Sequence, residues 1–397
     1  MSASPPLPYW RLSSFYFWYY AAIGGFTPYF AQWLHDLGQS ALAISALMAL
    51  WYCTRVFAPA VWSACTARSL APIYWLRAGA LLTLVGFAGF LFAVRFPALF
   101  AVMLFFSFFC NAIMPQFEAI TLDTLGARRA DYGRLRVWGS IGFILVTLAY
   151  GWLLQQHGSG WLPALMLPLF AATATSAFVN RMPAGVDHPH DEAHGTAWQA
   201  LQRPGVPAFL AVAMLMQIGF GPFYVFFTLY LGESGHGTAT IGALWALGVL
   251  AEIALFISSP ALLRQHGPIA LVLVCLGVTA VRWLMVAFAP HSIPLMAVAQ
   301  LLHALSFGIF HASCMQLVGH YFPGRLSTHG QALLYSIGSG FGGVLGATLA
   351  GVAWGFGGGR ASFVLAAVAA AAGFVIALRL RLPKPQPSVA ASVPAEV

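Results

Sequence analysis

Residues 24–50 read GGFTPYFAQWLHDLGQSALAISALMAL, and residues 221–247 read GPFYVFFTLYLGESGHGTATIGALWAL. The two stretches align without a gap when each residue of the first is laid on the residue 197 positions later. Identical residues recur along the alignment: Gly24 and Gly221, Phe26 and Phe223, Phe30 and Phe227, Leu34 and Leu231, Gly38 and Gly235, Ile44 and Ile241, Ala46 and Ala243, Leu47 and Leu244, Ala49 and Ala246, and Leu50 and Leu247. Some identities arise by chance in apolar sequence, but this run keeps one register. The sequence therefore predicts two similar halves.

The composition places both halves in a membrane. Charged residues make up 7% of the 397 residues, against about 25% in soluble globular proteins, and the mean hydropathy is +0.80. A spanning helix needs about 20 apolar residues. Apolar stretches separated by polar or Gly/Pro-rich breaks predict twelve such helices, near residues 12–33, 41–65, 70–93, 98–123, 136–156, 161–180, 207–231, 240–263, 268–288, 293–317, 332–356 and 361–380.

A long polar segment separates the halves and leaves six predicted helices on each side. We predict an all-α integral membrane fold of two pseudo-symmetric six-helix bundles, in residues 1–180 and 207–382, joined by a cytoplasmic linker at 181–206. The tail, residues 383–397, is rich in proline and is predicted to be disordered. Such a parallel repeat is typical of transporters whose halves rock about a site near the membrane midplane.

The linker also contains side chains of the types that bind metals: Asp187, His188, His190, Asp191, Glu192 and His194. Nothing in their spacing defines a coordination geometry, so we interpret the segment as a solvated linker and predict no metal site. The five cysteines show no CxxC spacing and are predicted to be free thiols.

Most basic residues fall on one side of the predicted bundle. Fourteen lie at or near helix ends that are cytoplasmic if the N-terminus is cytoplasmic: Arg11, Arg68, Arg77, Arg128, Arg129, Arg134, Arg136, Arg181, Arg203, Arg264, Arg325, Arg379, Arg381 and Lys384. Only Arg95 and Arg360 fall outside. The positive-inside rule therefore predicts that both termini are cytoplasmic, and we expect a monomer in a bacterial cytoplasmic membrane. Because the basic residues are dispersed, the net charge of +8 does not indicate a nucleic-acid partner.

Several charged residues lie inside the predicted helices, where a charge is unfavourable unless its surroundings stabilise it. An ionisable group at the bilayer centre costs on the order of 2.5–3.5 kcal/mol on insertion scales, so it persists where it faces a polar cavity or a partner. Glu118 and Arg136 are eighteen residues apart, one on a predicted helix and the other at the start of the next. The other residues of this kind are Arg55, Asp123, Glu252, Arg282, His303 and His311.

The segment around this pair carries a recognisable pattern. Glu118-Ala-Ile-Thr-Leu-Asp123, followed by Asp131-Tyr-Gly-Arg-Leu-Arg136-Val-Trp-Gly-Ser, resembles the lactose permease branch of the major facilitator superfamily, including the spacing between acid and arginine. The pattern is closer still to the phenylpropionate-permease-like group, which also shares the motifs at residues 244–252, 281–283, 302–303 and 311. The resemblance implies the fold described above and a substrate site lined by Glu118 and Arg136.

Two departures from lactose permease limit what the resemblance carries over. In that family a glutamate that carries the proton follows the helix-10 histidine by three residues, whereas here His303 is followed by Ser306. The loop after the second helix normally shows a Gly-x-x-x-Asp-Arg signature. Here it reads Trp62-Ser-Ala-Cys-Thr-Ala-Arg68, without the Gly and the Asp.

The residue that carries a proton must therefore be sought among the carboxylates of this chain. Proton coupling requires a carboxylate whose protonation responds to burial and to a nearby cation. We favour Glu252, in the middle of its predicted helix, over Glu118, and expect Arg282 and His303 beside it. The alternative is a static ion pair that stabilises the bundle.

Arginines at the predicted site favour an anionic substrate, because a guanidinium binds a carboxylate through two hydrogen bonds. The predicted substrate-binding residues are Glu118, Arg136, Trp138, Gln217 and Tyr224. Tyr20 and Tyr230 are further candidates for an aromatic wall, although aromatic residues in membrane helices more often pack or anchor.

Three residues are predicted to act at a gate or between the halves. The repeat register lays Arg55 on Glu252, so opposite charges occupy equivalent positions, and an ion pair between them is a hypothesis. Asp123 lies near a cytoplasmic helix end. His311 follows His303 by eight residues, which returns it to about the same helix face. A proton relay between the histidines is possible in principle, but packing is the favoured role of His311.

Together these features predict a secondary active transporter: a proton symporter of a small organic solute, with an aromatic or other organic acid favoured. The alternatives are a sugar or nucleoside symporter, a drug or metabolite efflux antiporter, and a membrane sensor that transports nothing. An enzyme is not expected, because a membrane-embedded transferase needs clustered carboxylates, and Asp123 and Asp131 fall in a helix end and a loop. No cofactor is expected, only a proton gradient.

Overall fold

The computed structural model describes residues 7–66, 72–181 and 202–382. The first half consists of six α-helices and three short 3-10 helices: α1 (Tyr9–Asp36), α2 (Ala41–Thr66), α3 (Pro72–Ala88), η1 (Gly89–Leu91), α4 (Phe96–Leu125), η2 (Gly126–Asp131), α5 (Tyr132–His157), η3 (Ser159–Trp161) and α6 (Leu162–Val179). The second half begins with three long helices: α8 (Val206–Glu233), α9 (Thr238–His266) and α10 (Pro268–Phe288).

The remaining part of the second half contains two π-helical segments, η4 and η6. Its elements are α11 (Ile293–Leu301), η4 (Leu305–Ile309), α12 (Phe310–Tyr321), η5 (Gly324–Leu326), α13 (Ser327–Leu333), η6 (Leu334–Phe341) and α14 (Gly342–Ala377). The predicted helices at 293–317 and 332–356 are therefore continuous in path but change their hydrogen-bonding pattern in the middle. Such π segments often occur at functional sites.

The membrane fold predicted from composition is confirmed. In the described ranges, ten helical segments are long and apolar enough to span a membrane. The helix α1 is not among the ten, yet it is a 28-residue helix with many buried residues. The last of the ten, His329–Ala377, has 49 residues and is broken by non-helical backbone at Gly357 and Gly358. With α1 added and this segment divided, twelve crossings result.

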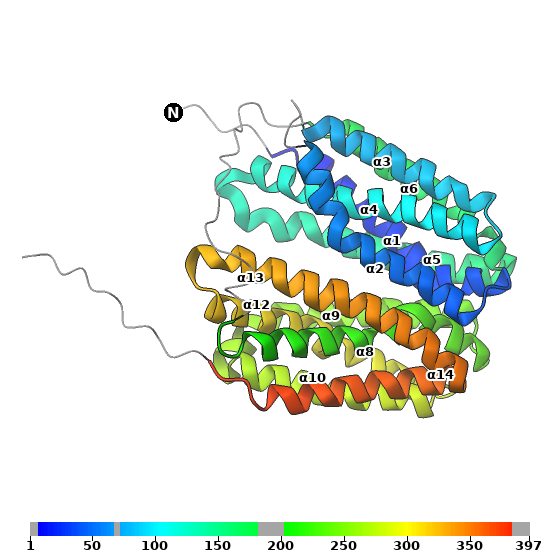
Figure 1. The fold of residues 1–397 in the computed structure, drawn as a ribbon. Coiled ribbons are helices and arrows are strands. Elements are labelled where there is room, and N and C mark those ends of the chain that lie inside the picture. Colours follow the sequence, from blue (N-terminus) through cyan, green and yellow to red (C-terminus); the bar gives the residue numbers. More distant parts are fainter. Residues whose placement is uncertain (1–6, 67–71, 182–201, 383–397) are drawn as a thin grey trace, which may run out of the picture.

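Two hydrophobic cores correspond to the two halves. One is formed mainly by α1 to α6 and the other by α8 to α14. Figure 1 shows these halves as two layers, with the first above the second. The exact domain limits stay a prediction, because most of the predicted linker at 181–206 and the predicted tail at 383–397 lie outside the described residues.

The repeat seen in the sequence has a counterpart in the backbone. Gly38 and Gly235 occupy equivalent turns after the first helix of each half, with φ of 80° and 91°. Such positive φ values favour glycine, which has no Cβ. Gly24 packs α1 against Phe143 of α5, and Gly221 packs α8 against Gly346 of α14. The same pair of helices is thus in close contact within each half.

The halves meet through pairs of helices that the repeat also relates. The helix α5 packs against α9, α2 packs against η6 and α14, and α1 packs against α8. We call the side on which α1 begins and α14 ends the terminus side, and the opposite side, where α1 and α8 end, the far side (Figure 1).

The glycine at the closest approach in the second half gives a test of this packing. We expect Gly221→Val to lower the melting temperature in detergent, because a Cβ at this position meets the backbone of Gly346. Overpacking typically costs about 1–3 kcal/mol. Gly355→Val on α14 is the matched control, because a Cβ there has open space. Thermal unfolding of both variants measures the difference, and equal melting temperatures would contradict the tight packing.

Candidate functional site

An arginine and a tyrosine from neighbouring helices form the first part of the site. The guanidinium carbon of Arg136 on α5 lies 3.9 Å from the centre of the Tyr20 ring on α1, and 5.9 Å from that of Tyr16. Gly139, one turn further along α5, leaves room for this stack. A Cβ there would lie 2.7 Å from Cδ2 of Tyr20 and 2.9 Å from Nη1 of Arg136. The arginine is therefore held in place by an aromatic ring, in a cation–π contact.

Glu118 belongs to the same region but does not form a direct ion pair with Arg136 in the described part of the chain. Instead the Tyr132 hydroxyl donates a hydrogen bond to Oε1 of Glu118, at 3.1 Å. Tyr16, Tyr20 and Tyr132 all lie within electrostatic range of both charges. The two residues thus line one polar region, with tyrosines between them, and the role of Glu118 and Arg136 in binding stays a prediction.

The second half contributes a carboxylate and an imidazole that face each other. Oε2 of Glu252 on α9 lies 3.8 Å from Nε2 of His303, and the side chains are 27% and 8% exposed. This distance is too long for a hydrogen bond but brings the two groups within ion-pair range. His303 lies where the span from Ile293 to Tyr321 changes from α11 to η4, so a break in the helix positions it.

Arg282 on α10 is fully buried, and none of its side-chain nitrogens has a hydrogen-bond partner among the described residues. Its guanidinium carbon lies 4.1, 4.8 and 5.6 Å from the ring centres of Trp283, Phe223 and Phe220. His303 packs on the same phenylalanines, with ring centres 5.5 Å from Phe223 and 5.8 Å from Phe220. Aromatic faces therefore provide the contacts that a carboxylate would otherwise make.

Gln300 is a polar residue of this cluster that the sequence did not indicate. It is fully buried on α11, and neither amide atom has a described hydrogen-bond partner. A Cβ at Gly248 would lie 3.0 Å from Oε1 of Gln300 and 3.6 Å from Cδ2 of His303. The cluster is thus packed against α9 at a glycine. A glutamine one helical turn before a candidate histidine was a weak signal, since neither residue type is specific to sites.

The charged residues that approach each other between the two halves are not the pair suggested by the repeat register. Among the described residues, the basic groups that act on the Glu252 carboxylate are His303 of its own half and Arg136 of the other half. Arg55 is exposed and has no ion pair with a described residue. Arg55 and Glu252 are therefore not paired in this conformation, and a pair in another gate state stays a hypothesis. The Glu252 carboxylate lies across the interface from Arg136 instead.

The other predicted site residues do not all lie in this cluster. Tyr224 on α8 stacks on Phe220 at 5.7 Å between ring centres and lies within electrostatic range of Glu252 and Arg282. Gln217 is half-buried on the face of α8 that approaches α14 at Gly342. Trp138 instead donates a hydrogen bond from Nε1 to the Tyr9 hydroxyl, at 2.9 Å, at the terminus side.

Three predicted residues lie away from this cluster. Tyr230 donates a hydrogen bond to the carbonyl of Ala287, at 2.9 Å, near the end of α8. Asp123 is half-buried near the end of α4. The ring of His311 lies 6.2 Å from that of Tyr335, whereas His303 faces Glu252. The π-helix η4 separates the two histidines, and its wider turn changes the spacing on which the same-face prediction depended.

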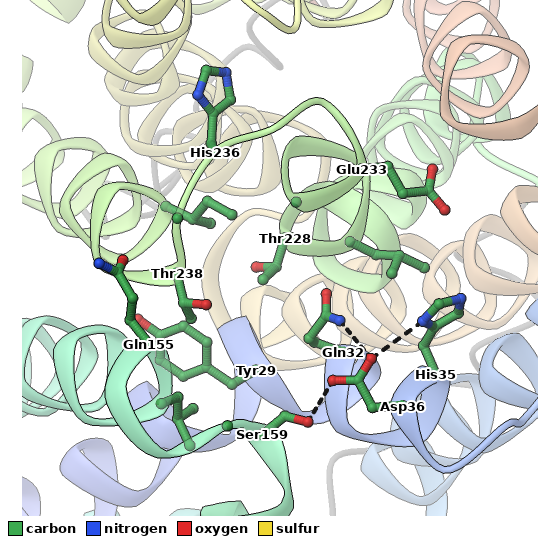
Figure 2. A pocket seen from close by; sticks show the side chains of 16 residues that line it. Tyr29, Gln32, His35, Asp36, Gln155, Ser159, Thr228, Glu233, His236 and Thr238 are labelled. Carbon is green, nitrogen blue, oxygen red and sulfur yellow. Dashed lines mark hydrogen bonds and ion pairs between the residues drawn. The ribbon is translucent and has the colours of Figure 1, made fainter.

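A separate cavity of about 460 Å³ opens on the far side, between the ends of α1, α5 and α8 and the start of α9. Figure 2 shows Asp36 accepting hydrogen bonds from Ser159 Oγ, at 2.5 Å, and from Gln32 Nε2, at 2.9 Å. On the opposite wall, Oε1 of Gln155 accepts a hydrogen bond from the backbone N–H of Ala239, at 3.0 Å. That bond joins α5 of the first half to α9 of the second.

Next to this cavity, close contacts at glycines hold the two halves together on the far side. A Cβ at Gly242 on α9 would meet the Tyr29 hydroxyl and would lie 2.9 Å from the Thr147 carbonyl oxygen and 3.4 Å from Cα of Gly151. Tyr29 itself donates a hydrogen bond to the Thr147 carbonyl, at 2.5 Å. The halves can come this close only because α5 and α9 present glycines to each other.

We expect Gly242→Leu to separate the halves on the far side, because the leucine side chain cannot fit between Tyr29 and α5. A cysteine at Leu229, which is 2% exposed at the cavity wall, should then react faster with a maleimide in detergent once the native cysteines are replaced by alanine. Gly160→Leu is the control, because a Cβ there has open space. Unchanged labelling by Gly242→Leu would contradict the role of this contact.

Comparisons with known proteins agree with this architecture. The family described as the MFS_1 like family matches residues 9–365. The chain is 28% identical over 306 residues to the "Probable 3-phenylpropionic acid transporter" of Escherichia coli (strain K12), covering 76% of this chain and 80% of that protein. It is 26% identical over 343 residues to the "Maltose permease" of Geobacillus stearothermophilus, covering 83% of each.

Solved structures show the same fold. The crystal structure of the nucleoside transporter NupG superposes with a TM-score of 0.80 at 16% identity, covering 93% of this chain and 96% of that chain. The crystal structure of an autoinhibited POT family peptide transporter gives a TM-score of 0.71 at 15% identity, covering 95% and 98%. At these identities the likeness concerns the fold alone.

Proposed function

The chain belongs to the MFS_1-like family of major facilitator permeases, and from this premise we propose that it is a proton-coupled symporter that moves a small organic solute by alternating access. It is an integral membrane protein of the transporter type, and its relatives are transporters rather than enzymes. Its substrate is therefore a small molecule. The coupling to protons, the identity of the solute and the direction of transport are the parts that we propose.

One observation carries the proposed proton coupling: Glu252 lies between a histidine of its own half and an arginine of the other. His303 is 3.8 Å away, and Arg136 acts on the carboxylate across the interface. Loss or gain of a proton at Glu252 changes the charge that Arg136 meets, so it alters the attraction between the halves. Protonation and the rocking of the halves are then linked. Arg282 adds positive charge within electrostatic range of His303.

Aromatic rings and an excess of cations support an aromatic or other organic acid as the substrate. Three arginines, Arg55, Arg136 and Arg282, and the carboxylates Glu118 and Glu252 lie within electrostatic range of Tyr20 or Tyr224. Phenylalanine, tyrosine and tryptophan side chains of the second half pack around His303 and Tyr224. A relative bears the name of a transporter of 3-phenylpropionic acid, which combines both features.

We further propose that both termini are cytoplasmic and that the far side faces the periplasm of a bacterial cytoplasmic membrane. Arginines are concentrated at terminus-side ends, as the positive-inside rule requires. The glycine contacts between α5 and α9 bring the halves close together on the far side, which supports a site that is reached from the cytoplasm. The carrier is proposed to act as a monomer and to need a proton gradient but no cofactor.

A sugar or nucleoside symporter is the second candidate, favoured by the maltose permease relative and by the fold shared with NupG. Uptake into proteoliposomes decides between the candidates. The purified protein is tested with 3-phenylpropionate, maltose and uridine, with and without an inward proton gradient. We expect gradient-dependent accumulation of the acid. Accumulation of maltose or uridine alone would replace the proposed substrate, and uptake that ignores the gradient would remove the proton from the mechanism.

A further inference from the structure

Three arginines within electrostatic range of Tyr20 or Tyr224 differ in how accessible their charges are. Arg282 is fully buried in its aromatic cage. Arg136 is partly buried on the Tyr20 ring and shares its surroundings with Glu118. Arg55 on α2 is exposed, and no described residue lies within hydrogen-bond or ion-pair distance of it. Among these three, only Arg55 is exposed and has neither a cation–π contact nor an ion pair with a described residue.

The neighbours of Arg55 on α2 show where its side chain points. Trp51 and Thr54 face α4, where Asn111 Nδ2 donates hydrogen bonds, each 3.0 Å, to the Trp51 carbonyl oxygen and the Thr54 hydroxyl. Tyr52 and Val56 face the second half, where Gly343 and Gly340 make room for them. Residues three apart share a helix face, and Arg55 lies three residues after Tyr52. The Arg55 side chain therefore lies towards the space between the halves.

Tyrosines from both halves surround this space. Arg55 lies within electrostatic range of Tyr20 on α1, Tyr52 on α2, Tyr224 on α8 and Tyr335 in η6. Glu118 acts on Tyr20 and Tyr335 as well. These tyrosines thus provide aromatic rings and hydroxyl groups near the Arg55 guanidinium. Such surroundings suit a ligand with an apolar ring and a charged group.

We propose that Arg55 binds the carboxylate of the transported organic acid, whereas Arg136 and Tyr20 form the wall against which the rest of the solute packs. This inference rests on the proposed function and assigns a substrate-binding role to a residue predicted from the sequence to act at a gate. A guanidinium offers a planar pair of N–H donors that matches a carboxylate. Because Arg55 has no carboxylate partner among the described residues, binding the substrate breaks no ion pair that the structure describes.

The assignment is tested by comparing an acid with its neutral amide in direct binding measurements on the purified full chain. The probes are 3-phenylpropionate and 3-phenylpropanamide, and the variants are Arg55→Gln and Arg55→Lys. Hydrogen bonds to charged groups account for about a tenfold to hundredfold change in affinity. We therefore expect Arg55→Gln to weaken binding of the acid by that factor and to leave amide binding nearly unchanged. Arg55→Lys should fall between, because it keeps the charge but loses the paired donors.

Arg95→Gln is the matched control, because it removes the same charge from an exposed position before α4. It should leave the binding of both probes unchanged. If Arg55→Gln weakens acid and amide equally, or neither, the carboxylate contact is overturned, while gradient-driven uptake of the acid by the wild type still supports the proposed function. If the wild type does not bind 3-phenylpropionate, the role of Arg55 in binding it is overturned, and the proposed function then depends on the uptake of maltose and uridine. Equal melting temperatures of wild type and Arg55→Gln exclude a folding defect.

Discussion

Replacing Glu252 with glutamine is expected to abolish accumulation of the solute against its gradient while leaving exchange of solute across the membrane. The amide keeps the size of the side chain and its place beside His303, but it cannot bind and release the proton. The proton gradient then does no work on the solute, although the halves still rock around it. Uptake by proteoliposomes with an imposed proton gradient measures the first part, and exchange of labelled for unlabelled solute at equal pH measures the second.

Glu118→Gln provides the contrast for this experiment, because it alters the glutamate of the first half that is predicted to line the site. This residue accepts a hydrogen bond from Tyr132 and is expected to affect binding of the solute more than its coupling to the proton. Retained accumulation in Glu252→Gln would remove this residue as the proton carrier and leave it as a structural partner of His303. Loss of both accumulation and exchange would indicate that Glu252 is needed for the rocking motion itself.

Arg136→Ala is expected to weaken binding of the solute by about tenfold or more, the range for loss of an interaction with a charged group. The reason is geometric as well as electrostatic. The guanidinium lies 3.9 Å from the Tyr20 ring, and its removal releases both the positive charge and the ring. Unlike Arg55→Gln, this variant should weaken the amide as well as the acid, because it disturbs the wall of the site. Direct binding of the two probes measures the effect.

Arg134→Ala is the control for that prediction. This arginine lies two residues earlier, with its side chain 77% exposed and paired with Asp131 at 3.4 Å, and it should leave binding unchanged. Unaltered affinity in Arg136→Ala would mean that the arginine stabilises the contact of α1 with α5 and does not bind the solute. In that case the melting temperature should fall while the affinity stays the same.

Local features of the chain were predictable because they depend on neighbouring residues. Gly38 and Gly235 are identical in the repeat and adopt the same left-handed turn. Gly24 and Gly221, also identical, both lie at a close helix contact within their own half. Sequence could not show that the helix carrying His303 would change to η4 two residues later. A π-helix depends on how neighbouring helices pack on the backbone, and no residue type marks it.

The sequence by itself determined the membrane-spanning helices, their division into two similar halves and the family, because composition, repeat register and motif spacing are properties of the chain. It also named most of the charged residues of the site, since a charge in an apolar helix stands out. Only the tertiary structure decided their partners: Arg136 with the Tyr20 ring, Glu252 with His303, and Arg282 with an aromatic cage. The repeat register relates equivalent positions in the two halves, whereas distances between side chains depend on how the halves dock and where each side chain points.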